Sequence, residues 1–400
     1  MKTSFRDAGT SRFRMPAEWE AHASTWLAWP HYKLDWPGKL EAIPWVYAEI
    51  VRYLSRRERV EIIVKDAAAE RLARKTLKRA HALNDGVGFH RWPTDRVWTR
   101  DSGCAFVWPS GVATGLSKTP EAGGAAAGTA ASPQIEESGG TGFFAGAARL
   151  AAVTWRFNAW AKYPNWRRDQ NIAGLMAKAA GANEIQPEFK GRRVVLEGGS
   201  IDVNGCGTIL TTEECLLSRV QQRNPGMKKA DYERIFAVYL GAPQVIWLGS
   251  GIVGDDTHGH VDDITRFVSP DTVVTSVEAD PKSENYQQLR ENIRRLRDAT
   301  TESGKPLATI DLPMPAPLYF DGRRLPASYA NFYMANGIVL VPVFNDPNDR
   351  VALDILADIF PDRDVVGIYC GDLIWGFGAI HCMTQQQPEI KPKLTLLTTR

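Results

Sequence analysis

The sequence predicts an α/β protein, because segments with the helical spacing of apolar residues alternate with short apolar segments typical of strands. Helical patterns at 40–54 and 67–83 are each followed by a strand pattern, at 58–64 and 86–92. The composition agrees with a globular enzyme, since 44% of the 400 residues are hydrophobic and 24% are charged. A chain of this length buries enough apolar surface to fold without disulfides.

The alternation continues after a segment of unusual composition. Residues 116–152 are rich in Gly, Ala, Ser, Thr and Glu and poor in large apolar residues, which predicts an inserted, mobile loop without chemistry of its own. A helix is expected at 169–180, closed by Gly181, and a strand at 193–196.

The last third of the chain repeats the same pattern. Ser283 is expected to cap a helix that buries Leu289, Ile293 and Leu296. We expect residues 1–14 to be disordered or extended and residues 15–400 to form a single domain. The remaining expected elements are a strand at 337–343, a helix that turns Val351, Ile355, Leu356 and Ile359 inward, and a strand at 364–368.

Charge and cysteine usage exclude several classes of protein. The net charge is only +2, from 48 basic and 46 acidic residues without a long basic run, so nucleic acid is not an expected partner. No apolar segment approaches the length of a membrane span, and the N-terminal residues lack the apolar core of a signal peptide. The five cysteines have no CxxC spacing, which argues against a disulfide framework and predicts a reducing, cytoplasmic location.

The most informative stretch is Gly376-Phe377-Gly378-Ala379-Ile380-His381-Cys382-Met383-Thr384, near the C-terminus. We interpret Cys382 as a nucleophile, because its glycine-rich and polar neighbours are unusual for a thiol that packs in a core. Gly376 and Gly378 would leave room for a substrate beside it. A lone cysteine is more often a small buried hydrophobic residue, so this interpretation depends on the other motifs.

Two further motifs follow strand patterns, where loops tend to carry chemistry. The first, Asp95-Arg96-Val97-Trp98-Thr99-Arg100-Asp101-Ser102-Gly103, is a polar cluster whose simplest alternative is a surface loop of salt bridges. The second is Glu197-Gly198-Gly199. Its glycines indicate a tight turn or a close approach to a ligand, although a hairpin with an exposed acid would give the same pattern.

The most polar segment is Asp255-Asp256-Thr257-His258-Gly259-His260-Val261-Asp262-Asp263. If the chain is extended here, His260, Asp262 and Ile264 share one face of a strand. Two functional interpretations follow: a metal site in which His258 and His260 belong to an HxHxD pattern, or a metal-free acid–base site that works with Cys382. A solvated loop is the third interpretation.

Four motifs thus stand in one order along the chain. They are Trp98-Thr99-Arg100-Asp101, Glu197-Gly198-Gly199, His260-Val261-Asp262 and His381-Cys382-Met383-Thr384. In that order they resemble the guanidine-modifying superfamily, and specifically the agmatine deiminase family of the bacterial peptidylarginine-deiminase type. Four more segments are similar to that family: Met15-Pro16-Ala17-Glu18-Trp19-Glu20, Trp26-Leu27-Ala28-Trp29-Pro30, Phe157-Asn158-Ala159-Trp160 and Asn331-Phe332-Tyr333.

The resemblance implies a pseudo-fivefold α/β propeller of ββαβ units, with the site at its centre. It implies hydrolytic deimination of a small guanidine, first of all agmatine to N-carbamoylputrescine and ammonia, a step toward putrescine in polyamine biosynthesis. Free or peptide-terminal arginine, giving citrulline, is the alternative. No metal or organic cofactor is expected, the expected partner is a small-molecule guanidine, and a homodimer is compatible with the sequence.

The resemblance also assigns roles to residues. Cys382 attacks the guanidinium carbon and forms a covalent amidino-thioether, while Asp101 and Asp262 hold the N–H groups of the cation. His260 moves protons, and Glu197 orients and charge-stabilises His260.

Trp98 and Arg96 are expected beside the substrate. Family members commonly have an acid where this chain has Arg96, and a proline where it has Cys104. A cation at position 96 would repel an amine tail or meet a carboxylate, which is why arginine remains an alternative substrate. His258 is expected to be structural, and His381 to be a neighbour of the nucleophile rather than the base.

Overall fold

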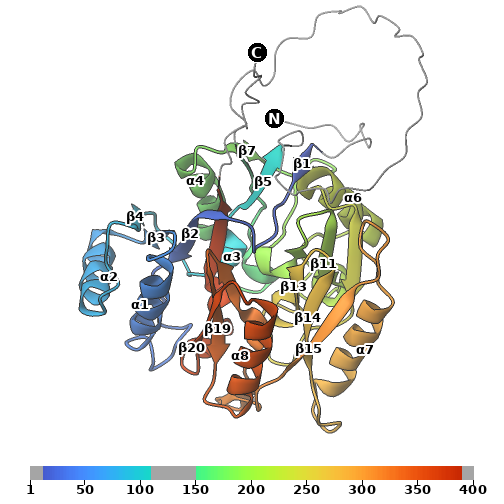
Figure 1. The fold of residues 1–400 in the computed structure, drawn as a ribbon. Helices are drawn as coiled ribbons and strands as arrows, with labels where there is room; N and C mark the ends of the chain where they lie inside the picture. Colours follow the sequence, from blue (N-terminus) through green and yellow to red (C-terminus); the bar gives the residue numbers. More distant parts are fainter. Residues whose placement is uncertain (1–11, 110–149, 390–400) are drawn as a thin grey trace, which may run out of the picture.

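The computed structural model describes residues 12–109 and 150–389. Most of the segment 1–14, and the insertion 116–152 up to residue 149, lie outside the described residues. The predicted α/β class is confirmed, with strands toward the middle of the molecule and the longer helices at its periphery (Figure 1). Of the described helices, none is long and apolar enough to cross a membrane.

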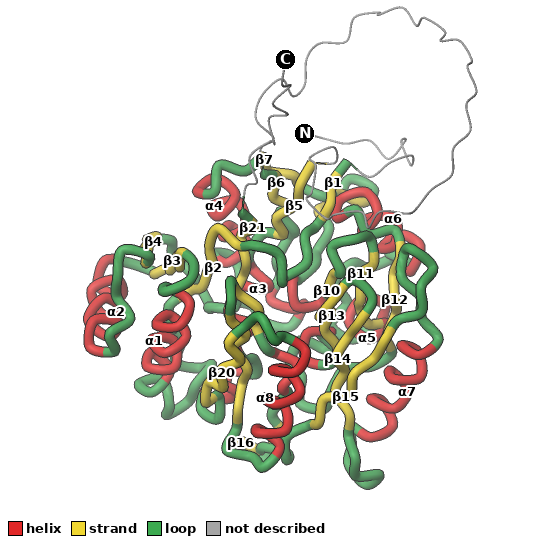
Figure 2. Tube along the Cα trace, viewed as in Figure 1, coloured by secondary structure: helices red, strands yellow, loops and turns green. Residues whose placement is uncertain are grey.

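Five sheets of three or four strands share one local order: two antiparallel strands, then a helix, then a strand parallel to the second. In the N-terminal sheet β21 (Thr384–Pro388) pairs with β2 (His22–Ala28), which α1 (Ile43–Leu54) connects to the parallel β3 (Arg59–Val64). Both chain ends therefore contribute to one sheet (Figure 2). Helix α2 (Ala67–Arg79) and strand β4 (Val87–Arg91) complete it.

The other four sheets repeat this order. The second sheet contains β1 (Phe13–Arg14), β5 (Ala105–Pro109), β6 (Ala151–Val153) and β7 (Asn183–Ile185), with helix α4 (Ile172–Ala179); the third contains β10 (Asp202–Val203), β11 (Thr208–Thr212) and β12 (Gln244–Leu248), with helices α5 (Glu213–Leu217) and α6 (Lys229–Leu240). The fourth contains β13 (Thr265–Ser269), β14 (Thr272–Val277) and β15 (Ala308–Pro313), with helix α7 (Tyr286–Arg297). The fifth contains β18 (Tyr333–Ala335), β19 (Ile338–Val343) and β20 (Asp364–Tyr369), with helix α8 (Asn348–Ile359). Two short ribbons, β8–β9 (Glu188–Phe189 and Arg192–Arg193) and β16–β17 (Tyr319–Phe320 and Arg323–Arg324), stand apart. The described strands form separate sheets, and the fivefold propeller stays a prediction.

A short helical turn precedes the first antiparallel strand of each sheet, and these five turns carry the site. They are α3 (Thr99–Ser102), η3 (Gly198–Ser200), η4 (Val261–Asp263), η5 (Tyr329–Asn331) and α9 (Ile380–Met383). Each turn contacts the next, from α3 through η3, η4, η5 and α9 back to α3. Motifs that lie far apart in the sequence are thereby brought to one place.

Several expected boundaries were wrong. The strand expected at 193–196 is reduced to β9, and Val195 forms only an isolated bridge with Arg156. Helix α7 begins at Tyr286 with Asn285 as its N-cap residue, so Ser283 does not cap it. In α8, Leu356 is buried as expected, but Val351 is 46% exposed and Ala352 faces the core instead.

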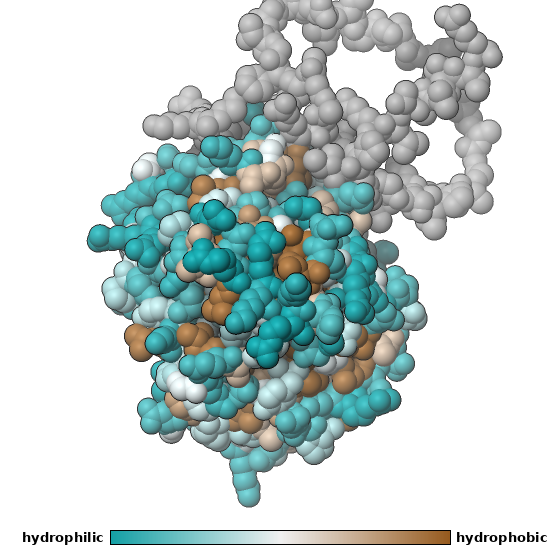
Figure 3. Space-filling model, turned by 90° about the vertical axis from the view of Figure 1, so that its left-hand side faces the viewer, coloured by the Kyte–Doolittle hydropathy of each residue, from teal (hydrophilic) through white to brown (hydrophobic). Residues whose placement is uncertain are grey.

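The surface offers no broad apolar face in the view of Figure 3, where polar residues predominate and hydrophobic residues gather in small separate groups. Exposed large hydrophobic residues such as Leu34 and Leu72 are normal when they are scattered singly. The expected homodimer stays a prediction.

Candidate active site

His260 lies at the centre of the cluster of predicted site residues. Its Nδ1 is 3.9 Å from a carboxylate oxygen of Asp101 and 3.9 Å from one of Asp262, and its Nε2 is 3.8 Å from Glu197 Oε2. All four side chains are buried. Neither ring nitrogen has a hydrogen-bond partner among the residues that the structure describes, so the imidazole is free to exchange protons with a bound molecule.

The strand expected to carry His260, Asp262 and Ile264 on one face was wrong. Residues 261–263 form the turn η4, in which the N–H of Ile264 donates to the carbonyl of Val261, and β13 begins only at Thr265. Asp255 holds the preceding loop by accepting from the backbone N–H groups of Gly259 and His260. The imidazole and the carboxylate still converge, but through a turn rather than through the period of a strand.

Cys382 lies at the edge of this cluster, with Sγ 3.7 Å from Asp262 Oδ2. The side-chain amide of Asn331 donates to the sulfur at 3.1 Å, and its oxygen accepts from the backbone N–H of His381. Burial raises the pKa of the Cys382 thiol, and the nearby carboxylates of Asp262, Asp263 and Asp101 raise it further. In the absence of a compensating cation the thiol keeps its proton.

The acids around His260 differ in how their charge is compensated. Asp101 accepts only from neutral donors, the indole N–H of Trp160 at 2.9 Å and the backbone N–H of Gly199 at 3.0 Å. Burial raises the pKa of Asp101 to about 6. Glu197 instead accepts from Arg223 at 3.1 Å, which lowers its pKa against the effect of burial.

The charge of His260 follows from these neighbours. Burial alone would favour the neutral ring, but Asp101, Cys215 and Glu197 together raise the pKa of His260 well above its ordinary value. A buried histidine that holds a proton is suited to acid catalysis, and the same ring becomes a base once the proton is given away.

A small pocket opens above Cys382. Its lining includes three residues expected beside the substrate, Arg96, Trp98 and Asp101, together with Trp160 and Cys382. The polar cluster 95–103 is therefore not a surface loop: Arg96, Arg100 and Asp101 are all buried.

The glycines next to Cys382, Gly376 and Gly378, both line the pocket, and a larger side chain at either position would not fit. A Cβ on Gly376 would lie 2.9 Å from the rings of Trp36 and Trp98, and one on Gly378 would lie 2.7 Å from Trp98. Glycine at these positions lets the tryptophan rings pack close to the nucleophile, where they form an apolar wall.

Arg96 is fixed by its own ion pair. Its Nε donates to Asp35 at 3.0 Å, its Nη2 donates to the same carboxylate, and its guanidinium lies 4.1 Å from the ring centroid of Tyr163. Within the described part of the chain its Nη1 has no hydrogen-bond acceptor. Asp256, also in the pocket lining, already accepts from Lys162, Tyr163 and Arg323.

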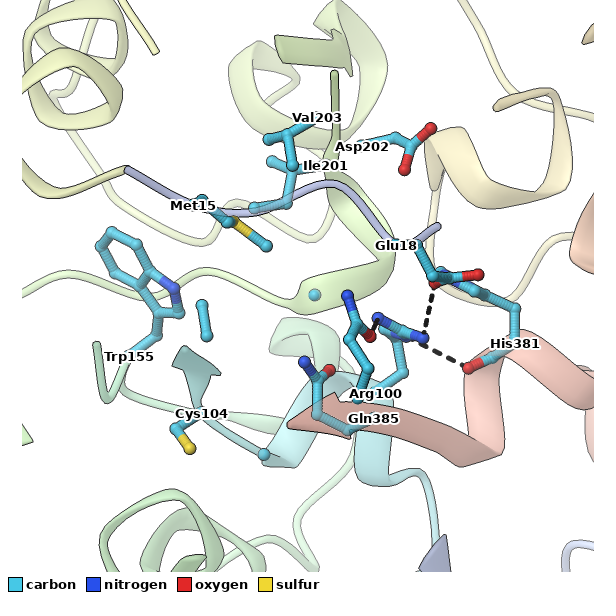
Figure 4. A pocket seen from close by; sticks show the side chains of 14 residues that line it. Met15, Glu18, Arg100, Cys104, Trp155, Ile201, Asp202, Val203, His381 and Gln385 are labelled. Atoms are coloured by element: carbon cyan, nitrogen blue, oxygen red, sulfur yellow. Dashed lines mark hydrogen bonds and ion pairs between the residues drawn. The ribbon is translucent and has the colours of Figure 1, made fainter. Parts of the chain in front are cut away.

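A second cavity lies behind the cluster, with about 20 Å³ open to the centres of water molecules. Figure 4 shows Glu18, Arg100 and His381 together on one wall, and Cys104 on another. Cys104 thus lines this second cavity, whereas Cys382 lines the small pocket described above.

The HxHxD metal set is not assembled. His258 lies 3.0 Å from Ser218 Oγ and 3.6 Å from Glu214, away from His260 and Asp262. In the described ranges, two groups bring three possible ligand atoms within 4.8 Å of one another, and neither includes His258.

Sequence reasoning missed several partners of these residues. Asn331 and Trp160 lie in segments that resemble the family, but no residue pattern pointed to their contacts with Cys382 and Asp101. Arg223 comes from a stretch that gave no signal. Glu18 was part of an N-terminal motif without an assigned role, and only the fold brings it to His381, 2.8 Å away.

Comparisons with known proteins show which family the chain is similar to. Residues 14–388 match the model of the family described as Porphyromonas-type peptidyl-arginine deiminase. The agmatine deiminase of Pseudomonas aeruginosa is 31% identical, over 94% of this chain and 95% of its own length.

Solved structures are similar as well. That of the Enterococcus faecalis agmatine deiminase has a TM-score of 0.79 at 27% identity and covers 96% of this chain and 100% of its own. The C. jejuni agmatine deiminase has a TM-score of 0.73 at 26% identity, with coverages of 95% and 97%.

Fold, cluster and relatives together define an enzyme that hydrolyses carbon–nitrogen bonds of amidines. More narrowly, the chain belongs to the Porphyromonas-type peptidyl-arginine deiminase family, which its family model matches along nearly the whole described length.

Proposed function

We propose that the chain hydrolyses a small guanidine to the ureido compound and ammonia through a covalent intermediate on Cys382. The observation that carries this proposal is the cluster of three buried carboxylates around His260, with Cys382 3.7 Å from one of them, Asp262; Asp101 and Cys382 also line the pocket. Carboxylates that converge on one site can accept the N–H groups of a planar cation.

Binding is assigned to Asp101 and Asp262. The Oδ1 atom of Asp262 has no hydrogen-bond partner from the described chain, so it is available to the N–H groups of a guanidinium. A cation between these acids compensates the charges that raise the pKa of the Cys382 thiol, and thereby favours the thiolate. Substrate binding and nucleophile activation are thus one event.

The steps then balance as follows. The thiolate bonds to the guanidinium carbon, His260 gives its proton to one NH₂ group, and the bond to that nitrogen breaks to release ammonia. A water molecule next gives a proton to the neutral His260, and its oxygen bonds to the same carbon. The sulfur–carbon bond then breaks, and the remaining hydroxyl proton of the adduct passes to the departing sulfur, which replaces the proton that the Cys382 thiol gave to solvent when the cation bound. Glu197 holds the charge and orientation of His260 through both steps.

Agmatine is the leading substrate, because the relatives are named for it. Arginine is a second candidate on one specific observation: the pocket holds a spare donor, Nη1 of Arg96, whereas the acceptors of Asp256 already have partners. A carboxylate tail would meet the spare donor, while an ammonium tail would have to displace Lys162 or Arg323 from Asp256.

The test is a panel of agmatine, arginine and a peptide ending in arginine, assayed for ureido product and ammonia. Cys382→Ala should reduce turnover at least about 10³-fold, and Cys370→Ala, which removes a buried thiol outside the cluster, should not. Chelators should have no effect. Full activity of Cys382→Ala, or loss with chelator, would refute the proposal, and turnover of agmatine equal to or better than that of arginine removes the second candidate.

A further inference from the structure

His381 lies between two buried carboxylates. Its Nε2 is 2.8 Å from Glu18 Oε2 and its Nδ1 is 2.7 Å from Asp262 Oδ2. The side chain is 2% exposed. Both distances are those of strong hydrogen bonds with an ionised partner, so each ring nitrogen is engaged with an acid.

Glu18 is held in the ionised form by contacts other than His381. Glu18 accepts from Arg266 at 2.9 Å, from Arg100 at 3.1 Å and from the backbone N–H of Met334 at 2.9 Å. The pKa values of Glu18 and Asp262 are lowered against the effect of burial, Glu18 chiefly by Arg266 and Asp262 chiefly by His381. An ionised carboxylate accepts hydrogen bonds and donates none.

The number of N–H donors that the His381 ring can offer then decides its protonation state. A neutral imidazole donates from one nitrogen and presents a lone pair at the other. At 2.7–2.8 Å, that lone pair would face an oxygen lone pair of either Glu18 or Asp262 in a buried site. An imidazolium donates to both acids and removes the conflict.

Accordingly, we infer that His381 is held as an imidazolium and is a positioning residue for the guanidine substrate, acting through Asp262. This inference rests on the proposed deimination. His381 fixes Oδ2 of Asp262 and leaves Oδ1 for the substrate. The result is a line of alternating charges, from Arg100 and Arg266 through Glu18, His381 and Asp262 to the guanidinium.

Without the second proton on His381, Asp262 would be drawn toward other neighbours. Its Oδ2 lies 3.7 Å from Cys382 Sγ, and its Oδ1 lies 3.9 Å from His260. A carboxylate released by His381 is free to turn toward either group, and the substrate then loses its acceptor. Asp202 is another charged group near this line of charges, and its carboxylate lies 3.5 Å from Nε of Arg266.

Two substitutions test the two hydrogen bonds of the His381 ring separately. The amide nitrogen of asparagine occupies the place of Nδ1, so His381→Asn keeps the donor to Asp262, while glutamine reaches the place of Nε2, so His381→Gln keeps only the donor to Glu18. If His381 positions the substrate, His381→Gln should raise KM about 10–100-fold with a smaller change in kcat. His381→Asn, which keeps the donor to Asp262, should raise KM much less. His90→Asn, which by the same reasoning loses the 2.8 Å contact between Nε2 and Glu61, is the matched control for breaking a histidine–carboxylate pair.

The protonation state is measured independently of turnover. Nitrogen NMR of ¹⁵N-histidine-labelled Cys382→Ala protein, with the His381 signals assigned by their loss in the Gln variant, should find protons on both ring nitrogens at pH 7. Binding of agmatine and arginine to the same protein by calorimetry should weaken about 10–100-fold with Gln and much less with Asn.

A singly protonated His381, or equal effects of Gln and Asn on KM and binding, would overturn the inference. If no guanidine binds at all, the proposed function fails, whereas the NMR result still decides the state of the ring. The two failures are therefore distinguishable.

Discussion

Gly199 is the position at which the geometry of the cluster can be tested with a single methyl group. A Cβ added there would lie 2.5 Å from His260 Nδ1, 2.9 Å from Asp262 Oδ2 and 3.1 Å from Asp101 Oδ1. The backbone of Gly199 is not in the left-handed region, so alanine fits its conformation. Gly199→Ala thus places a methyl group among the three side chains without straining the chain.

The expected magnitude follows from these distances. Ordinary contacts of a Cβ begin near 3.4 Å, so the His260 ring has to retreat by about 1 Å, and a misplacement of that size costs roughly 10²-fold in rate. Overpacking costs about 1–3 kcal/mol of stability. We therefore expect kcat/KM to fall about 100-fold while the protein remains folded.

The assay is kcat/KM for ureido product together with the thermal midpoint. Gly174→Ala is the control, because Gly174 lies inside α4 and its Cβ would meet only the end of the Glu184 side chain at 3.3 Å. Gly198→Ala should fail differently, since its Cβ would lie 2.3 Å from the backbone oxygen of Arg100 and the fold itself has to shift. If Gly199→Ala keeps kcat/KM within about 3-fold of the parent value, the assigned geometry is refuted.

Three more results are expected. Trp160→Phe removes the indole donor to Asp101, and KM should rise about 10-fold with kcat little changed; an unchanged KM contradicts this role. As the pH falls through about 6, Asp101 takes up a proton and loses its attraction for the cation, so KM measured from pH 5 to 8 should rise at the acid end; a flat KM argues against Asp101 as a binding acid. Glu197→Gln removes one of the groups that raise the pKa of His260, so the alkaline limb of kcat should move to lower pH, and a limb that stays in place assigns the proton to another group.

Local patterns were sufficient for the class of fold and for most long elements. The apolar spacing at 40–54 and the strand pattern at 58–64 correspond to α1 and β3 within a few residues. The turns that carry the site were not predictable, because three or four residues are too short for any periodicity. His260 and Asp262 were expected to converge through a strand and converge through a turn instead.

The partners behind the site depend on contacts between distant residues, which no local pattern contains. His381 meets Glu18 across 363 positions of sequence, and Asn331 meets Cys382 across 51. The motif order indicated which residues belong together, but it could not indicate that His381, interpreted as a mere neighbour of the nucleophile, faces two acids.

Compensation of charge links these observations to the choice of substrate. Among the described residues, Glu197 has Arg223 behind it and Asp262 has His381, whereas Asp101 accepts hydrogen bonds from neutral donors, lies 3.9 Å from the His260 ring and has a pKa raised to about 6. A guanidinium supplies the missing positive charge, stabilises ionised Asp101 and reduces the cost of a thiolate at Cys382. The ureido product is neutral and returns the cluster to its uncompensated state. The acids therefore favour binding of the substrate over the product, and the nucleophile is reactive only while a cation is present.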